Sequence, residues 1–208
     1  RPMPPTCQLR EESLPSGARM RNFFRTLAPE QFDASVAIRA DGSYFYSYDG
    51  ILIFVPAFIQ ACRAGFLEAR LEARLKHAAA QLRDEGFRYA QYLARGRYAV
   101  FLERSVARGQ SSCFPSREMK VFCIQPQADG AIVIGGSRPD ANAPCQLSGT
   151  DAEIDGRLTV RLEKGVNVVK HNAQTKRSNL NHFLVYQWRI KSPDADPFMV
   201  VQLPELGR

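Results

Sequence analysis

The sequence lacks the features that identify most membrane proteins and many enzymes. No apolar run reaches the roughly 18 residues that a membrane-spanning helix needs. The longest run, 50–61, contains Pro56 and Gln60. The glycine-containing segments fit neither GxGxxG nor GxxxxGK[ST], and no serine lies in a GxSxG elbow. The usual motifs of nucleotide binding and serine hydrolysis are therefore absent.

Histidine and cysteine are few and are poorly spaced for binding a metal. The chain has three histidines, and its five cysteines form no CxxC pair. His77 lies on an expected helix, while His171 and His182 flank a loop with no carboxylate or cysteine at ligand spacing. We therefore expect no metal and no cofactor. An enzyme would have to use Cys113 or the His171/His182 loop, and because no base or orienting group is placed beside them, we expect no enzyme.

The chain is basic, with 28 Lys and Arg against 21 Asp and Glu and a net charge of +7. The excess is not concentrated in one long run, and the densest stretches are ARMRNFFR and VVKHNAQTKR. A basic balance suits an anionic partner, but it is also typical of an ordinary solvated surface.

Alternation of apolar and polar residues predicts a β-hairpin near the start of the chain. Strands are expected over 32–38 and 43–55, joined by an Asp-Gly turn. Pro56 then favours the start of a helix, because its missing N–H would have no partner in the first turn. Two helices are expected, over 57–64, ended by Gly65, and over 67–85.

The remaining chain predicts short strands bounded by turn residues, over 87–93, 97–103, 119–124, 131–134, 153–162, 166–171, 183–190 and 197–203. This order predicts an α+β fold: a mainly antiparallel sheet opened by the hairpin, two consecutive helices packed on one face, and a C-terminal all-β extension. The last four strands either extend the sheet or form a small sandwich.

Composition divides the chain into four parts. Residues 1–30 are rich in Pro, Ser and Gly at their start and are expected to form an extended N-terminal arm. Residues 31–136 are expected to form the α+β domain, 137–150 a loop and 151–205 a C-terminal β region. Because the chain begins at Arg1 rather than Met, we expect that a signal peptide has been removed.

Tyr44, Tyr46 and Tyr48 alternate along the second hairpin strand and so share one face. We expect this to be the outer face of the sheet, with Phe45 directed into the core. The row is either a stacking platform for bases or sugars or a result of the strand preference of tyrosine. Because the residue pattern of RNA-binding sheets is absent, the second interpretation is preferred, and nucleic acid is not the expected partner.

The stretch ARMRNFFR combines three arginines, Arg19, Arg21 and Arg25, with two aromatic residues, Phe23 and Phe24. This combination suits an anionic headgroup surface or an acidic groove, so these five residues are the predicted partner-binding site. The alternative is that the stretch is simply where the chain enters the fold.

The cysteines indicate one disulfide if the compartment is oxidising. Cys113 and Cys123 could face each other across two strands, and Cys145 lies in the expected loop. The pairing among these three is open, because connectivity is not encoded in spacing. Cys62 lies on a helical apolar face and is expected to be buried.

The C-terminal part combines a strand followed by Asn, a strand that bears Trp, and a closing apolar strand. Val168, Val169, Asn172, Trp188 and Ile190 carry this pattern. It resembles the end of the LppM-type envelope proteins of bacteria. The layout of DGSYFYSYDG and the helices after it is similar to uncharacterised proteobacterial proteins.

The resemblance implies a small envelope domain that binds anionic lipid or a protein partner and has no catalytic residues. Chains of that family usually carry a lipid-attached N-terminus or a membrane span. Here Cys7 is not preceded by the L-[AS]-[GA] pattern of lipid attachment, and no span follows Leu203.

We therefore expect a non-enzymatic binding or assembly component of a larger complex in the bacterial periplasm, bound to a protein partner and in contact with an anionic membrane surface. The alternatives are a nucleic-acid-binding module that uses the tyrosine row and the basic loops, and an enzyme with Cys113 or the His171/His182 loop at its site.

Overall fold

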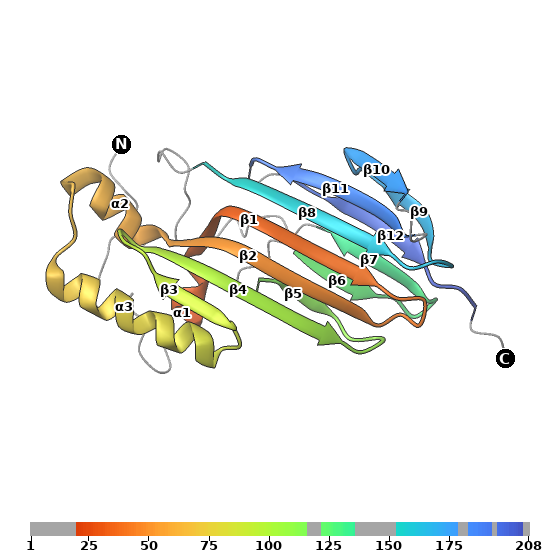
Figure 1. The fold of residues 1–208 in the computed structure, drawn as a ribbon, viewed down its shortest axis with the longest axis horizontal. Helices are drawn as coiled ribbons and strands as arrows, with labels where there is room; N and C mark the ends of the chain where they lie inside the picture. Colours follow the sequence, from red (N-terminus) through yellow and green to blue (C-terminus); the bar gives the residue numbers. More distant parts are fainter. Residues whose placement is uncertain (1–19, 116–121, 136–152, 179–182, 193–194, 206–208) are drawn as a thin grey trace. The chain divides into compact units, whose positions relative to one another are not determined.

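A computed structural model describes residues 20–115, 122–135, 153–178, 183–192 and 195–205 (Figure 1). The elements within these ranges are α1 (Met20–Arg25), β1 (Leu27–Ile38), β2 (Tyr44–Phe54), α2 (Val55–Ala64), α3 (Ala69–Asp84), β3 (Tyr89–Tyr92), β4 (Arg97–Val106), β5 (Ser112–Phe114), β6 (Phe122–Pro126), β7 (Ala131–Gly135), β8 (Asp155–Leu162), β9 (Asn167–His171), β10 (Thr175–Ser178), β11 (Leu184–Ile190) and β12 (Phe198–Gln202). None of the helices in these ranges is both long enough and apolar enough to cross a membrane.

The strands form two sheets. The seven-stranded sheet has the order β10-β11-β8-β1-β2-β4-β3, and the five-stranded sheet has the order β5-β6-β7-β12-β9. Most pairs are antiparallel. The fold is therefore the predicted α+β class with mainly antiparallel sheets. Of the last four predicted strands, β8 and β11 extend the first sheet, whereas β9 and β12 join the second.

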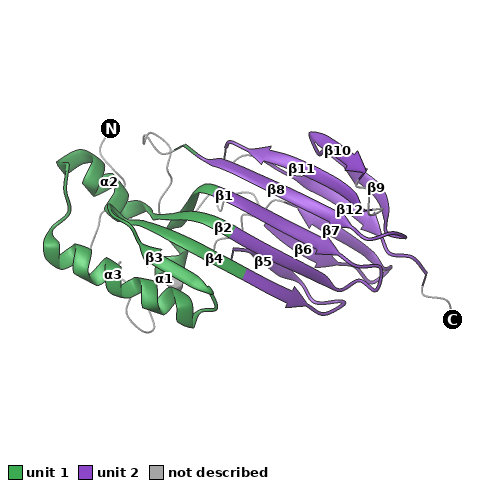
Figure 2. Cartoon of the chain, in the orientation of Figure 1, with its two compact units in different colours: residues 1–31, 49–102, 140–153 green, residues 32–48, 103–139, 154–208 purple. Residues whose placement is uncertain are grey.

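The chain divides into two compact units that interleave along the sequence (Figure 2). Unit 1 contains residues 1–31, 49–102 and 140–153, and unit 2 contains the rest. This differs from the predicted consecutive division at 31–136 and 151–205, because long strands such as β1 and β2 contribute residues to both units. The predicted loop 137–150 lies outside the described residues.

The end of the predicted N-terminal arm is regular structure. Helix α1 begins at Met20 and β1 begins at Leu27. Phe23 is completely buried in unit 1, where its ring lies 5.1 Å from that of Phe54 and 6.0 Å from that of Tyr98. Burial of such a ring stabilises the segment against the core, which explains why it does not stay extended.

The two predicted helices are confirmed in unit 1. Pro56 lies in the first turn of α2, and Gly65 ends that helix with a left-handed φ of 80°. Helix α3 buries the apolar stripe Leu75, Ala78, Ala79 and Leu82, and the Tyr98 hydroxyl donates a hydrogen bond to the carbonyl of Leu75 at 2.8 Å.

Unit 2 is built from two sheet layers, and the tyrosines of β2 lie between them. Tyr44, Tyr46 and Tyr48 are only 2%, 1% and 0% exposed, so the prediction of an outward-facing aromatic row is wrong. The ring of Tyr46 packs edge-on against Phe114 of β5, with centroids 4.0 Å apart. Phe45, which was expected in the core, lies on the other face and is partly exposed.

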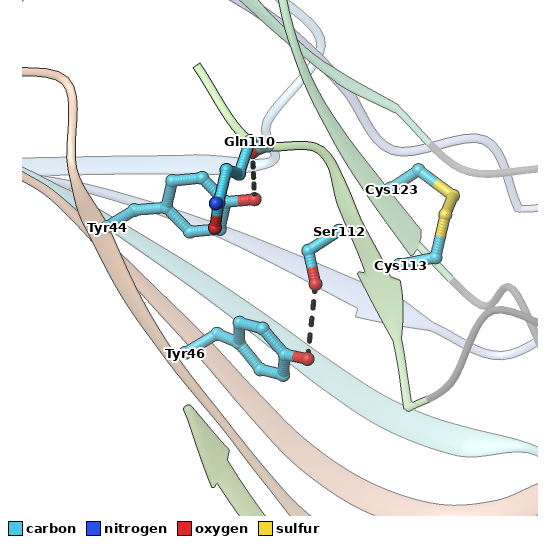
Figure 3. Close-up of a disulfide and its surroundings, with 6 residues drawn as sticks. All are labelled: Tyr44, Tyr46, Gln110, Ser112, Cys113 and Cys123. Atoms are coloured by element: carbon cyan, nitrogen blue, oxygen red, sulfur yellow. Dashed lines mark hydrogen bonds between the residues drawn. A yellow bond between two sulfur atoms is a disulfide. The ribbon is translucent and has the colours of Figure 1, made fainter. Parts of the chain in front are cut away.

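The tyrosine hydroxyls reach partners on and beside β5 (Figure 3). Tyr44 donates to the carbonyl of Gln110 at 2.7 Å, and the Ser112 hydroxyl donates to that of Tyr46 at 3.1 Å. The physical reason for the wrong prediction is the five-stranded sheet, which covers this face. Its contacts come from residues more than 60 positions away, which local alternation does not encode.

Candidate functional site

The positive charge of the chain is concentrated on a few strands. Residues 155–192 contain eight Lys and Arg but only two Asp and Glu, which gives this segment a net charge of +6 out of +7 for the whole sequence. The segment holds strands β8 to β11 of unit 2. Nearly all of the excess positive charge is therefore carried by one contiguous segment of the sequence.

Strand pairing arranges part of this charge on one exposed face. Arg177 of β10 lies opposite Val185 of β11, which in turn lies opposite Arg161 of β8. Residues opposite one another share a face of the sheet. Four positions further along, Arg189 of β11 lies opposite Arg157 of β8. We call these four exposed arginines and the residues between them the cationic sheet face.

A hydrogen-bonded row separates the two arginine rows. Thr175 donates to the Gln187 amide oxygen at 3.5 Å, and the Gln187 amide nitrogen donates to the hydroxyl of Thr159 at 3.3 Å. The same three residues are register partners across β10, β11 and β8. They hold neighbouring strands in register and keep the face free of apolar bulk at its centre.

The arginines in one row are paired with acids. Arg189 forms a two-pronged ion pair with Asp155, with Nε–Oδ1 and Nη2–Oδ2 distances of 3.1 and 3.0 Å. Arg157 lies 3.0 Å from a carboxylate oxygen of Asp33. The hydrogen bonds from Arg189 hold the pKa of Asp155 below its usual range. These pairs offset the repulsion between two arginines that lie directly opposite each other.

The arginines in the other row have no such partner. Within the part of the chain that the structure describes, neither Arg161 nor Arg177 forms an ion pair. Strand spacing places them about 10 Å apart across the sheet. Two exposed charges at this separation suit an extended anionic surface, on which neighbouring headgroups can each contact one arginine.

The sequence reasoning missed this face, although its pattern is visible. Arg157 and Arg161 alternate with Leu158, Val160 and Leu162 along one strand, which is typical of a strand with one buried face. Dense basic runs do not reveal this face, because its cations are spaced two or four residues apart in the sequence. The stretch VVKHNAQTKR identified only the contribution of Arg177 and its neighbours.

The structure describes only some of the predicted partner-binding residues. Phe23 and Phe24 are buried in unit 1, at 0% and 4% exposure, so they cannot contact a partner. Arg25, at the end of α1, is exposed. Arg19 lies outside the described residues, and Arg21 lies in α1 with its side chain undescribed. The aromatic residues serve the core, as the alternative interpretation held.

The cysteines give two different outcomes. Cys113 and Cys123 are opposite each other on β5 and β6 and form a disulfide (Figure 3). The sulfur of Cys113 is therefore not a free thiol. Cys62 is exposed rather than buried, because it lies on the outward side of the last turn of α2. Cys7 and Cys145 lie outside the described residues.

The histidines do not form a metal centre among the residues described. No group of three His, Cys, Asp or Glu side chains with metal-binding geometry occurs there. The exposed His171 accepts a hydrogen bond at Nδ1 from the Ala173 backbone and packs on the ring of Tyr186. His182 lies outside the described residues, so the His171/His182 pair remains a prediction.

Asn172 and Trp188, which carry the C-terminal sequence pattern, are bonded to each other. The Trp188 indole donates to Asn172 Oδ1 at 2.8 Å, and the Phe198 backbone N–H donates to the same oxygen at 2.8 Å. Asn172 follows β9 of one sheet, whereas Trp188 belongs to β11 of the other. The pattern therefore links the two layers of unit 2 and satisfies a mostly buried indole N–H.

Fold and site together define an α+β protein with two mainly antiparallel sheets and an exposed cationic sheet face. No family model and no curated protein sequence matches the chain. Among solved structures, the NMR structure of the folded domain of LppM from Mycobacterium tuberculosis is similar to it, with a TM-score of 0.39 and 12% identity, over 86% of this chain and 90% of that chain.

Proposed function

We propose that the protein is a non-enzymatic binding component of the bacterial cell envelope, and that its cationic sheet face docks on an anionic membrane surface. The observation that carries this proposal is the row in which Arg161 and Arg177 are exposed, lie on one face and form no ion pair among the described residues. Charge complementarity selects the occupant, since a flat array of anionic headgroups can satisfy both arginines at once.

The disulfide supports a location outside the cytosol. Disulfides persist in oxidising compartments such as the periplasm and are rare where thiols are kept reduced. The disulfide joins Cys113 of β5 to Cys123 of β6. Both strands belong to the five-stranded sheet that covers the tyrosine row. We therefore propose that the protein acts in the periplasm.

Vesicle binding tests the docking proposal. We expect the protein to co-sediment with phosphatidylcholine vesicles that contain phosphatidylglycerol, and not with pure phosphatidylcholine vesicles. Each basic residue near such a surface contributes about 1 kcal/mol, so the double variant R161Q/R177Q should bind about 30-fold more weakly. Binding should also fall in about 1 M salt, where the Debye length is about 3 Å.

A matched control separates this face from net charge alone. The variant R63Q/R70Q removes two exposed arginines from helices of unit 1 and changes the net charge equally. Its affinity for the vesicles should fall by less than about 3-fold, because these side chains are not on the cationic sheet face. Equal losses in the two variants would contradict the proposal, since binding would then follow total charge.

A protein partner is the other outcome of this experiment. If no vesicle is bound, but tagged protein retains a stoichiometric partner from an envelope extract at high salt, docking on lipid is wrong and the component belongs to a protein assembly. The loss of that partner in R161Q/R177Q would then assign the same face to it. Retention of nucleic acid instead would revive the basic-surface alternative without the tyrosines, which are buried.

A further inference from the structure

A hollow lies beside the paired arginine row of unit 2. Its volume is about 450 Å³, within the range of about 300 to 1,000 Å³ that is usual for small-ligand sites. It forms where β8 begins and β11 ends, close to the start of β10. Although apolar atoms contribute more of the surface than polar atoms do, six lining residues have side chains that can donate or accept hydrogen bonds: Asp155, Arg157, Gln174, Thr175, Gln187 and Arg189.

The two arginines that line the hollow are each paired with an acid. Arg189 is paired with Asp155 and Arg157 with Asp33, at 3.0 Å in each case. The two guanidinium groups therefore do not present net positive charge to a ligand, in contrast to Arg161 and Arg177. Balanced pairs give little long-range attraction for an anion.

The same pairs leave hydrogen-bonding capacity unused. A guanidinium has five N–H donors, and the Asp155 pair engages two nitrogens of Arg189. The side chains of Arg189 and Asp155 are 60% and 49% exposed, so donors and acceptors are both accessible. A hydroxyl group donates and accepts at once, and is therefore the ligand group that fits such a lining.

The lining is held in place by bonds to the backbone and the core. Gln174 accepts from the Arg189 backbone N–H at 2.8 Å and donates to its carbonyl at 3.4 Å. Trp188 is fixed by its bond to Asn172. Because the fold already orders these side chains, binding a ligand costs little further conformational entropy, which favours binding by polar contacts.

We infer that this hollow binds a neutral, hydroxyl-rich ligand, such as one unit of a saccharide. The guanidinium groups donate to ligand oxygens, and Asp155 accepts from ligand hydroxyls. This site is separate from the row of Arg161 and Arg177 that is proposed to dock on lipid. It therefore does not depend on that proposal.

The position of the only tryptophan makes the site directly measurable. Trp188 lines the hollow, and the chain has no other tryptophan, so its fluorescence reports binding there. We would titrate the protein with glucose, galactose, N-acetylglucosamine and glycerol, and separately with inorganic phosphate. We expect a saturable fluorescence change with at least one saccharide and none with phosphate. No response to any saccharide, or a stronger response to phosphate, would overturn the inference.

Two substitutions test the chemical class of the ligand, and one of them, Asp155→Asn, has opposite expected effects on the affinity for a polyol and for an anion. Asp155→Asn removes the acceptor charge and frees Arg189. Saccharide affinity should fall about tenfold, since a hydrogen bond to a charged group is lost, whereas a site for oxyanions should bind phosphate more tightly. Arg189→Gln should weaken saccharide binding by a similar factor.

Controls keep this test apart from vesicle docking. The variant R161Q/R177Q should retain the full fluorescence response, because neither arginine lines the hollow. Loss of vesicle binding with an intact saccharide response would leave the inference standing. Unchanged circular dichroism establishes that a variant is folded, and if Asp155→Asn fails that criterion, the wild-type comparison of saccharide with phosphate decides alone.

Discussion

Two rows of side chains in unit 2 show how similar sequence patterns can have opposite structural roles. The tyrosine row of β2 and the arginines of β8 both arise from alternation along a strand. The tyrosines are almost completely buried, whereas Arg157 and Arg161 are exposed. The difference arises because the five-stranded sheet packs over the tyrosine face only.

The chemistry of tyrosine and of arginine explains why the first row can be buried and the second is exposed. A tyrosine can bury its ring if the hydroxyl finds a partner, as Tyr44 does at the carbonyl of Gln110. Burial raises the pKa of the Tyr44 phenol, so it stays protonated and able to donate. Burying an arginine costs far more free energy of desolvation unless the guanidinium is paired with an acid. A tyrosine row is thus compatible with either face, but an arginine row indicates the solvent face.

The largest expected effect on stability comes from truncating a tyrosine of the buried row. Tyr46→Ala should lower the free energy of unfolding by about 3 to 5 kcal/mol, because it leaves a cavity against Phe114. Tyr89→Ala, at a tyrosine that is 47% exposed, should cost less than about 1 kcal/mol. Denaturant unfolding of both variants measures the contrast. Equal costs would show that the tyrosine row is not core.

The disulfide gives the next largest effect, because it fastens the strand that covers the tyrosines. Cys113 and Cys123 are 10 residues apart in the sequence, and closing a loop of this length is worth about 3 kcal/mol in the chain-entropy model. The variant C113S/C123S should therefore unfold at lower denaturant. Cys62→Ser, at an exposed free cysteine, should change stability by less than about 0.5 kcal/mol. A large effect of Cys62→Ser alone would contradict its place on the surface.

Much of the fold could be predicted because its local patterns are strong. The hairpin, the proline at the start of α2, Gly65 at its end and the apolar stripe of α3 all depend on residues close in sequence. Helix α1 and the short strands β5 and β10 were missed. Strand β10, TKRS, is exposed at every position, so no apolar alternation marks it.

The site could not be predicted to the same degree, because it depends on strand order. The row of Arg161 and Arg177 exists only because β8, β11 and β10 are neighbours in the sheet. The hollow likewise requires Gln174 and Arg189 to lie beside the start of β8. Alternation tells which residues share a face of one strand, but it does not give the pairing between strands or the layer that covers them.

The smallest effect on stability should come from the exposed arginine row. R161Q/R177Q should change the free energy of unfolding by less than about 0.5 kcal/mol, because neither arginine forms an ion pair within the described chain. Arg157→Gln should cost somewhat more, between about 0.2 and 1 kcal/mol, since it breaks the exposed pair with Asp33. Denaturant unfolding at low salt measures both. If R161Q/R177Q proved as costly as Tyr46→Ala, the arginines would be structural. A neutral effect on stability together with a large loss of vesicle binding would assign the row to recognition.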